Sequence, residues 1–319
     1  MSRTGLGRIG PVGRASPHHH TSGASMGPRR VLVTTLAVLA SLASLTACGG
    51  GSSSAKSADN PYQLSVPGTI RVGTLSDAPP NVYLKDGKFT GFDNDLFTAV
   101  AAKAGLKVEF AATDFSSLLS QVANHKFDVG SSSITVTEAR KKTVAFTNGY
   151  DFGYFGLDVP AGSPITAFDQ LAGKRVVVVQ GTVQDDYATK NNLNPVRVPD
   201  YNGALNQLKA GTAEAWISPA EIGEKSAQDS GGKVVLAQKQ LSSAPTAFAV
   251  AQNRPELLAA LNKALDEVIA DGTWTRLQEQ YYPGRPVPDG FKPGNGSVGY
   301  PPVKAAPTTG APAGASPTP

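Results

Sequence analysis

Strand and helix signals alternate along the middle of this 319-residue chain, and the alternation restricts its fold more than any other feature. Residues 69–74 are predicted as a strand, and a helix is expected to begin with Asp93 as its cap. Apolar and polar residues alternate over 106–110, as in a second strand, and Asp114 is expected to cap a second helix before a short strand at 127–130. This order favours a parallel sheet covered by helices.

The same pattern restarts after Pro164. Residues 175–179 form a β-branched run that predicts a strand buried on both faces. A Gly181-Thr182 turn follows it and leads into a helix over 184–190. Further strands are predicted at 196–198, 213–217 and 246–250, and further helices at 201–209 and 255–271. The sequence thus indicates two α/β units, with the chain passing twice between them.

The amino-terminal segment has the layout of a secretory signal. Arg29-Arg30 precedes a 15-residue apolar run at 31–45, which ends in Leu45-Thr46-Ala47-Cys48. The run is shorter than the roughly 20 apolar residues that a membrane span needs. Leu-Thr-Ala-Cys has the form of a bacterial lipobox, so we expect a signal peptide at 1–47 and lipid attached to Cys48, the start of a tether over 48–61. A free cysteine after an ordinary signal peptide is the alternative, and Met26 is a possible true start.

Charge and composition argue against a nucleic-acid partner. The formal net charge is +4, but five arginines precede Cys48, which leaves 24 basic against 25 acidic residues after it, near −1. The longest basic run is Arg140-Lys141-Lys142, and nucleic-acid binding needs clustered basic side chains. Residues 289–319 are rich in Pro, Gly and Ala, which predicts a disordered tail. No metal-ligand spacing occurs in the mature chain, so neither metal nor cofactor is expected.

Several motifs in a fixed order carry a family resemblance. They are Gly-Phe-Asp-Asn-Asp-Leu at 91–96, Phe-Asp-Val at 127–129, Thr-Glu-Ala-Arg at 137–140, Leu-Ala-Gly-Lys-Arg-Val at 171–176, Val-Gln-Gly-Thr at 179–182, Asp-Gly-Thr-Trp at 271–274 and Tyr-Tyr at 281–282. Over residues 69–283 the chain resembles the extracellular solute-binding proteins of family 3, which are amino-acid-binding receptors of ABC importers. The resemblance implies an α/β, two-lobed periplasmic-binding-protein-like fold of type II. In this fold two mixed sheets, flanked by helices, are joined by two crossing hinge strands.

The resemblance also divides the chain into lobes. Lobe 1 is expected at 62–154 and 246–288, and lobe 2 at 155–245, with crossings near 153–155 and 244–246. The ligand is expected in the cleft between the lobes. Periplasmic binding proteins close around their ligands by a hinge motion, because the closed state is favoured only when ligand bridges both lobes.

Arg140 is the first candidate for ligand binding. In the family pattern this arginine grips the ligand carboxylate, and its planar guanidinium matches a carboxylate with two parallel hydrogen bonds. A solvated arginine in a basic helical turn is the alternative. Ser132, Ser133 and Thr135 lie just before it, in a loop at the carboxyl end of a strand, where ligands of open α/β sheets bind.

Lobe 2 offers Thr182 and Gln184 at a helix amino terminus, where free amide groups attract anions. Phe115 matches the position of an aromatic wall in the family, with a core phenylalanine as the alternative. The acidic residue that family members place after the lobe-2 strand, for the ligand ammonium, falls on Pro219. Glu221 is one replacement; a shifted register, neutral acceptors or a ligand without an ammonium group are the others.

A second departure lies around the proline pair at 79–80. The family often places aromatic residues before and after it, whereas this chain has Ala78 and Asn81, with Tyr83 as the nearest candidate wall. This composition fits a shorter polar ligand better than a long cationic one. Asp77 is a candidate contact for a polar end of the ligand, and Trp216 is expected in the core.

These observations predict a receptor that captures an amino acid, polar or acidic rather than cationic, for an ABC permease and its ATPase. It is expected to be monomeric and anchored by lipid on the extracytoplasmic face of the cell membrane. A binder of amine-free carboxylates and a ligand sensor are the alternatives. A cyclohexadienyl-dehydratase-like enzyme is a minor alternative, because general acid–base catalysis needs a positioned group and the mature chain has only His125. No enzymatic activity is therefore expected.

Overall fold

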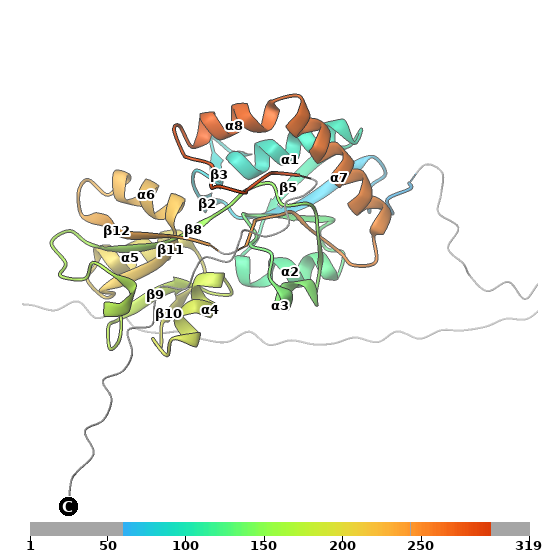
Figure 1. Cartoon of the computed structure of the whole chain (residues 1–319). Helices are drawn as coiled ribbons and strands as arrows, with labels where there is room; N and C mark the ends of the chain where they lie inside the picture. The colour runs from blue at the N-terminus through green and yellow to red at the C-terminus, as the bar shows by residue number, and fades with distance from the viewer. Residues whose placement is uncertain (1–59, 243, 295–319) are drawn as a thin grey trace, which may run out of the picture. The chain divides into compact units, whose positions relative to one another are not determined.

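The computed structural model describes residues 60–242 and 244–294 (Figure 1). These residues form an α/β fold with two five-stranded sheets and a separate three-stranded sheet. Cys48, the signal segment and residues 295–319 of the predicted tail lie outside the described residues. Among the described residues, no helix is long and apolar enough to cross a membrane.

The first sheet has the strand order β5-β1-β6-β13-β7. β1 pairs in parallel with β5 and β6, whereas β13 runs antiparallel to β6 and β7. Its strands are β1 (Thr69–Thr74), β5 (Lys107–Ala112), β6 (Val129–Ser131), β7 (Ala145–Phe146) and β13 (Ala249–Val250). The helices of this lobe are α1 (Phe92–Lys103), α2 (Phe115–Ala123), α3 (Glu138–Lys141), α7 (Pro255–Ala270) and α8 (Thr273–Tyr281).

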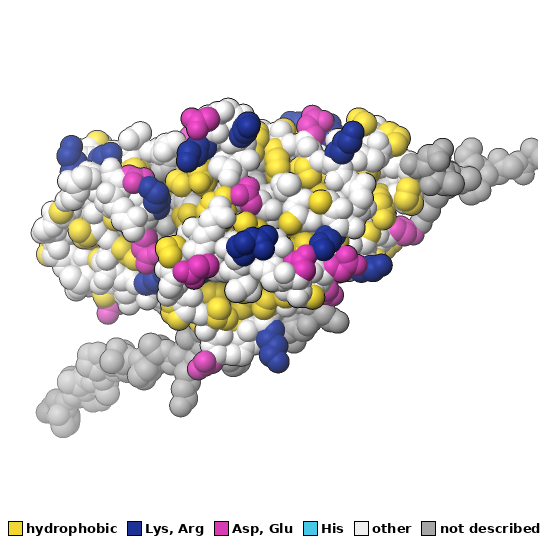
Figure 2. Space-filling view, turned by 90° about the horizontal axis from the view of Figure 1, so that it is seen from above, with side chains coloured by type: hydrophobic (Ala, Val, Ile, Leu, Met, Phe, Trp, Pro, Cys, Tyr) yellow, Lys and Arg dark blue, Asp and Glu magenta, His cyan; other side chains and the backbone are white. Residues whose placement is uncertain are grey.

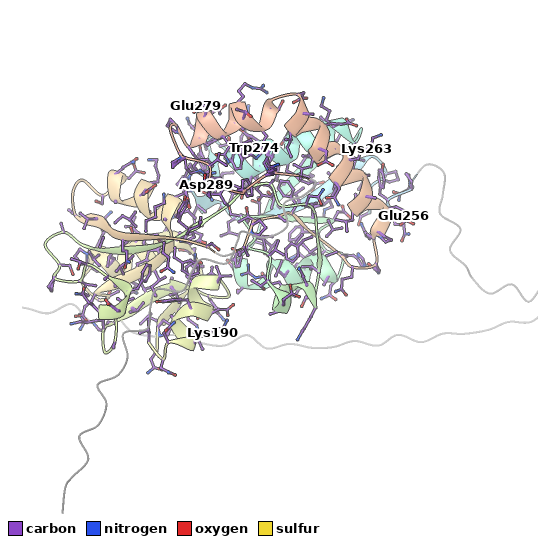
Figure 3. The ribbon with its side chains drawn as sticks, viewed as in Figure 1. Lys190, Glu256, Lys263, Trp274, Glu279 and Asp289 are labelled. Atoms are coloured by element: carbon purple, nitrogen blue, oxygen red, sulfur yellow. The ribbon has the colours of Figure 1, made fainter. Side chains whose placement is uncertain are left out.

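Successive side chains of β13 point to opposite faces of the sheet, and each face is covered by its own set of helices. Val250 packs with α1, α7 and α8, whereas its neighbour Ala249 packs on the other face with α2. Figure 1 shows α1, α7 and α8 on one side of the sheet and α2 with α3 on the other. Trp274, labelled in Figure 3, reaches from α8 into this core, where its Nε1 donates to the Tyr150 carbonyl at 2.6 Å.

The second sheet has the order β10-β9-β11-β8-β12. β9 is parallel to β10 and β11, whereas β8 is antiparallel to β11 and β12. Its elements are β8 (Tyr154–Pro160), η1 (Phe168–Gln170), β9 (Val176–Val179), α4 (Val183–Lys190), β10 (Val196–Val198), α5 (Tyr201–Lys209), β11 (Ala215–Pro219), α6 (Ala220–Asp229) and β12 (Val234–Leu241). All four residues of β9 are buried, as the β-branched run predicts.

Two crossing segments join the sheets and hydrogen-bond to each other. The Thr246 amide donates to the Asp151 carbonyl at 2.9 Å, and the Tyr150 amide donates to the Thr246 carbonyl at 3.0 Å. The Ser242 amide donates to the Gly153 carbonyl at 2.8 Å. This is the pair of hinge strands expected for the two-lobed fold. The lobe limits at 154/155 and 245/246 stay a prediction. They agree with the sheet topology, because β7 and β13 belong to the first sheet and β8 and β12 to the second.

One helix start and one hairpin differ from the sequence prediction. α1 begins at Phe92 with Gly91 as N-cap, so Asp93 lies inside the first turn and caps nothing. Gly91 has φ 111°, and a Cβ there would lie 2.4 Å from the Asn81 carbonyl oxygen, which explains the glycine. Asp114 is the N-cap of α2, but its side chain makes no capping hydrogen bond. The sequence also did not indicate the small sheet of β2 (Asp77–Ala78), β3 (Val82–Lys85) and β4 (Lys88–Thr90).

Candidate ligand-binding cleft

One cavity of about 50 Å³ lies between residues of the two lobes. Its walls contain eight of the residues that the sequence predicted for ligand binding, namely Phe115, Ser132, Ser133, Thr135, Arg140, Thr182, Gln184 and Glu221. The predicted residues therefore converge on one place, although they come from separate loops and helices. Their role toward a ligand stays a prediction.

Arg140 lies at the junction of the two lobes. Thr137 caps α3, and its Oγ1 accepts a hydrogen bond from the Arg140 amide at 3.2 Å. The guanidinium donates to the Thr135 carbonyl at 2.8 Å and, across the cleft, to the Gly181 carbonyl at 3.0 Å. It also lies over the Phe115 ring, 5.1 Å from the centroid. Burial lowers the pKa of Arg140, but an arginine stays protonated, so the cleft contains a fixed positive charge.

The loop before Arg140 is held by protein groups. The Ser132 hydroxyl donates to the Ser131 carbonyl at 2.5 Å and accepts from the Leu75 amide at 3.0 Å. Ser133 has a left-handed φ of 44°, and both its amide and its hydroxyl donate to Asp93. Asn81 in turn donates to the Ser133 hydroxyl at 2.7 Å. These bonds fix the shape of the loop and leave Ser133 Oγ with acceptor rather than donor capacity.

Asp93, which the sequence predicted as a helix cap, instead supports the backbone of Ser133. It is fully buried, and burial raises the pKa of its carboxyl to about 7, against the opposing effect of the Ser133 hydrogen bonds. A non-glycine residue in the left-handed region is unfavourable by about 1–3 kcal/mol unless its surroundings hold it. The two bonds to Asp93 provide this support for Ser133.

The facing wall is the amino terminus of α4. Thr182 caps this helix, because its Oγ1 accepts from the Asp185 amide at 3.2 Å while donating to the Val179 carbonyl at 2.7 Å. Val183 and Gln184 begin the helix, and both line the cavity. Helix-start amides and the helix dipole favour an anion at this place.

Gly181 lets the lobes approach each other closely. Its φ is 78°, and a Cβ at this position would lie 3.1 Å from the Cα of Ser116 in the first lobe. Glycine is therefore needed both for the backbone conformation and for the closed contact.

The acidic side of the cavity is formed by Pro219, Glu221 and Asp151. Pro219 is the N-cap of α6 and brings no charge. Glu221 lies in the first turn of that helix, and its carboxylate is 3.5 Å from Arg285 Nη1 and 3.9 Å from Lys239 Nζ. Burial raises the pKa of Glu221, and the two cations oppose this shift. Within the described residues, Glu221 Oε1 accepts no hydrogen bond.

Sequence reasoning missed Asp151, which lines the cavity, and Arg285, its ion-pair partner outside the cavity lining. Asp151 lies on the first hinge strand, lines the cavity and forms an ion pair of 2.6 Å with Arg285 Nη2. Arg285 follows α8, in a Pro- and Gly-rich stretch whose composition gave no sign of a buried charge. Only the tertiary structure shows that this stretch returns to the hinge.

Four further residues named in the sequence analysis have clear positions. Tyr83 does not line the cavity but a separate groove beside α6 and α8, so it is no wall of the cleft. Asp77 also lies outside the cavity; its carboxylate accepts the Asn202 amide at 2.9 Å, which ties β2 to α5 across the cleft. Trp216 is fully buried in the core, as expected. His125 is half-buried beside Asn253 and lies outside the cavity.

The described residues contain no cluster of His, Cys, Asp or Glu that could hold a metal ion. Figure 2 shows basic and acidic side chains interspersed on the face that it presents, with no basic patch. The fold and the cavity together therefore define a two-lobed binding protein for a small ligand.

Comparison with known proteins assigns the family. The family model "Bacterial extracellular solute-binding proteins, family 3" matches residues 70–284. The probable amino-acid-binding protein YxeM of Bacillus subtilis is 31% identical over 258 residues, which cover 78% of this chain and 94% of the relative. The chain belongs to the bacterial extracellular solute-binding proteins of family 3.

Solved structures agree on the fold. An ancestral arginine-binding protein bound to arginine superposes with a TM-score of 0.65 at 32% identity, covering 67% of this chain and 98% of that one. An ancestral amino-acid-binding protein described as a precursor of cyclohexadienyl dehydratase gives a TM-score of 0.61 at 29% identity, covering 67% and 96%. Other relatives are named as binding proteins for histidine, arginine, or lysine, arginine and ornithine, and one as a probable amino-acid ABC transporter-binding protein.

Proposed function

We propose that this protein captures a free amino acid for an ABC importer by closing its two lobes around the ligand. The observation that carries the proposal is the pairing of Arg140 with the amino terminus of α4 on opposite walls of one cavity, 3.0 Å apart at the Gly181 carbonyl. A carboxylate between them would interact with a guanidinium from one lobe and with helix-start amides from the other. Such a ligand favours closure, because it gains both sets of bonds only in the closed state.

The opposite end of the ligand is assigned to Glu221. Its Oε1 accepts no hydrogen bond from the described residues, although its side chain is only 4% exposed; Arg285 Nη1 lies at 3.5 Å, an ion-pair distance without a hydrogen bond. An α-ammonium group would supply the missing donor. Glu221 thus replaces the acid that the family pattern leads us to expect at Pro219.

Entry of an amino acid requires the cleft to open. A cavity of about 50 Å³ is far below the roughly 300–1,000 Å³ typical of small-molecule sites. Separation of the lobes breaks the bond from Arg140 to Gly181 and frees the guanidinium for the ligand. The hinge strands around Asp151 and Thr246 are the place for this motion.

For the ligand side chain we propose an uncharged polar group rather than a cationic one. Beyond the charged groups, the cavity wall contains the uncharged polar residues Asn81, Ser242 and Thr246 besides the apolar Leu75, Ala78, Val82 and Ile222. No unpaired acid faces this part of the cavity in the described residues. Some relatives are named for arginine or lysine binding, so the ligand panel described below must compare cationic with uncharged amino acids.

Isothermal titration calorimetry of the purified protein tests the proposal with the common amino acids and a panel of amine-free carboxylates. Arg140→Ala should weaken binding at least 100-fold, since two hydrogen bonds to a charged group contribute about 1.5–3 kcal/mol each. Arg276→Ala is the matched control, because Arg276 is exposed on α8 and, among the described residues, its side chain bonds only to Thr273 Oγ1, at 3.2 Å. Retained affinity in Arg140→Ala would refute the assignment of the carboxylate site, and binding of amine-free acids alone would favour that alternative ligand class.

We further propose binding without catalysis. One structural relative is described as a precursor of cyclohexadienyl dehydratase, so an enzyme is the alternative to a binding protein. Both carboxylates that line the cavity, Asp151 and Glu221, are paired with Arg285. A general acid or base needs a carboxyl group free to exchange its proton with the substrate, and this pairing opposes that role.

Anchoring through lipid on Cys48 is part of the same proposal, together with an extracytoplasmic location, a monomeric state and docking to a permease and its ATPase. It rests on the signal-like segment and the lipobox form of residues 45–48. Cys48→Ala should move the protein from the membrane fraction to the soluble fraction. Unchanged partitioning would refute the anchor.

A further inference from the structure

Arg285 lies outside the cavity lining, on the segment that follows α8, and its guanidinium contacts the two carboxylates that line the cavity. This segment packs along the hinge strands (Figure 1), where the Phe291 ring lies 5.0 Å from that of Phe152 and the Gly294 amide donates to the Gly149 carbonyl at 2.8 Å. The Arg285 side chain is only 7% exposed, and its guanidinium lies over the Tyr282 and Phe152 rings at 3.8 and 4.3 Å. The position of this charge is therefore fixed by packing.

One guanidinium serves both acids of the cavity. Arg285 Nη2 is 2.6 Å from Asp151 on the hinge strand, and Arg285 Nη1 is 3.5 Å from Glu221 in lobe 2. Gln278 supports the arrangement, because it donates to Asp151 at 2.9 Å and accepts from Arg285 Nη2 at 2.8 Å. The two carboxylates are only 4% exposed. Buried carboxylates of this kind need a partner, since an unpaired buried charge is strongly unfavourable.

The charge balance around the cavity follows directly. Arg140 and Arg285 are positive, and Asp151 and Glu221 are negative, so this set of four largely buried groups is neutral; Lys239, 3.9 Å from Glu221, is 30% exposed and is not counted in it. A zwitterion with an uncharged side chain keeps it neutral. A ligand with an extra ammonium or guanidinium group would bring a second positive charge, for which neither carboxylate remains once Arg285 pairs with Asp151 and the α-ammonium group with Glu221, and specificity often arises from such an unmatched charge.

We propose that Arg285 is the residue that sets the charge selectivity of the cleft: as an internal counter-cation for Asp151 and Glu221, it selects against amino acids with a cationic side chain. This inference rests on the proposed amino-acid binding. Arg285 acts through the two carboxylates and is therefore a positioning residue.

The test compares the affinities for glutamine, lysine and arginine, measured by calorimetry on wild type and Arg285→Gln. Wild type should bind glutamine at least tenfold more tightly than lysine or arginine. In Arg285→Gln the ratio should shift at least tenfold toward the cationic ligands. A merely structural role would weaken all three alike. Arg285→Lys should restore the wild-type preference, and Arg276→Gln on the exposed face of α8 should leave the ratio unchanged.

A second variant gives an independent measurement, because Arg285→Gln leaves two buried carboxylates without their partner and can fail to fold. Glu221→Gln keeps the Asp151–Arg285 pair and leaves the set with an excess positive charge. It should raise the affinity for glutamate relative to glutamine at least tenfold.

The outcomes are distinguishable. Wild type that binds arginine or lysine as tightly as glutamine would overturn the inference about Arg285 and leave amino-acid binding intact. Unchanged affinity ratios between cationic and uncharged ligands in the folded variants would also overturn the inference about Arg285. Wild type that binds no amino acid would overturn both the inference and the proposed function.

Discussion

Replacement of Gly181 by alanine would test lobe closure directly. The added Cβ would lie 3.1 Å from Ser116 Cα, a few tenths of an ångström closer than an ordinary contact, so the lobes must separate slightly or the loop must shift. Forced contacts of this kind cost about 1–3 kcal/mol, which corresponds to an affinity roughly 5- to 150-fold lower for a ligand that binds the closed state.

The backbone of Gly181 adds a separate effect on stability. Its φ of 78° lies in the left-handed region, where a residue with a Cβ costs about 1–2 kcal/mol. In a domain of this size the melting temperature should fall by about 2–8 °C. This loss occurs with or without ligand, so it must be separated from the effect on closure.

Gly211 supplies the matched control. It has φ 71°, and a Cβ there would meet no atom of the described residues within 4 Å. Gly211→Ala should therefore lower the melting temperature by the same amount as Gly181→Ala and leave ligand affinity unchanged. Thermal unfolding and calorimetry on both variants give the comparison. Wild-type affinity in Gly181→Ala would show that the ligand-bound state does not use this contact, and the closure argument would be wrong.

Three further predictions concern stability and the cleft. Burial raises the pKa of Asp158 from 3.8 to about 7, so between these pH values the native state binds more protons than the unfolded state. The free energy of unfolding therefore falls as pH rises through this range. Asp158→Asn should flatten this part of the pH–stability curve, and an unchanged slope would contradict the prediction. Asp77→Ala removes the 2.9 Å bond from the Asn202 amide across the cleft and should lower ligand affinity about 2- to 13-fold, as calorimetry can measure. Trp274→Phe removes the donor to the Tyr150 carbonyl and should lower the free energy of unfolding by about 1–3 kcal/mol in denaturant titrations; wild-type stability would show that the bond contributes nothing.

Local patterns in the sequence predicted most elements, because each depends on residues close in the chain. The strand at Thr69–Thr74 and the helix at Tyr201–Lys209 have the predicted limits. The buried run of β9 was equally clear, since four consecutive valines suit a strand covered on both faces. The hairpin of β3 and β4 was missed, because its short strands are mostly exposed and show no clear alternation.

The sequence by itself also indicated eight residues that line the cavity, from Phe115 to Glu221, although it pointed as well to Tyr83 and Asp77, which do not line it, and missed Asp151, which does. It could not determine what those residues contact. Asp93 resembled a helix cap in the sequence, yet it supports the strained Ser133 forty positions away. Arg285 lies 134 positions from Asp151 in the chain. Contacts between such distant residues depend on how the lobes and the segment after α8 pack, and no local pattern of residues encodes that packing.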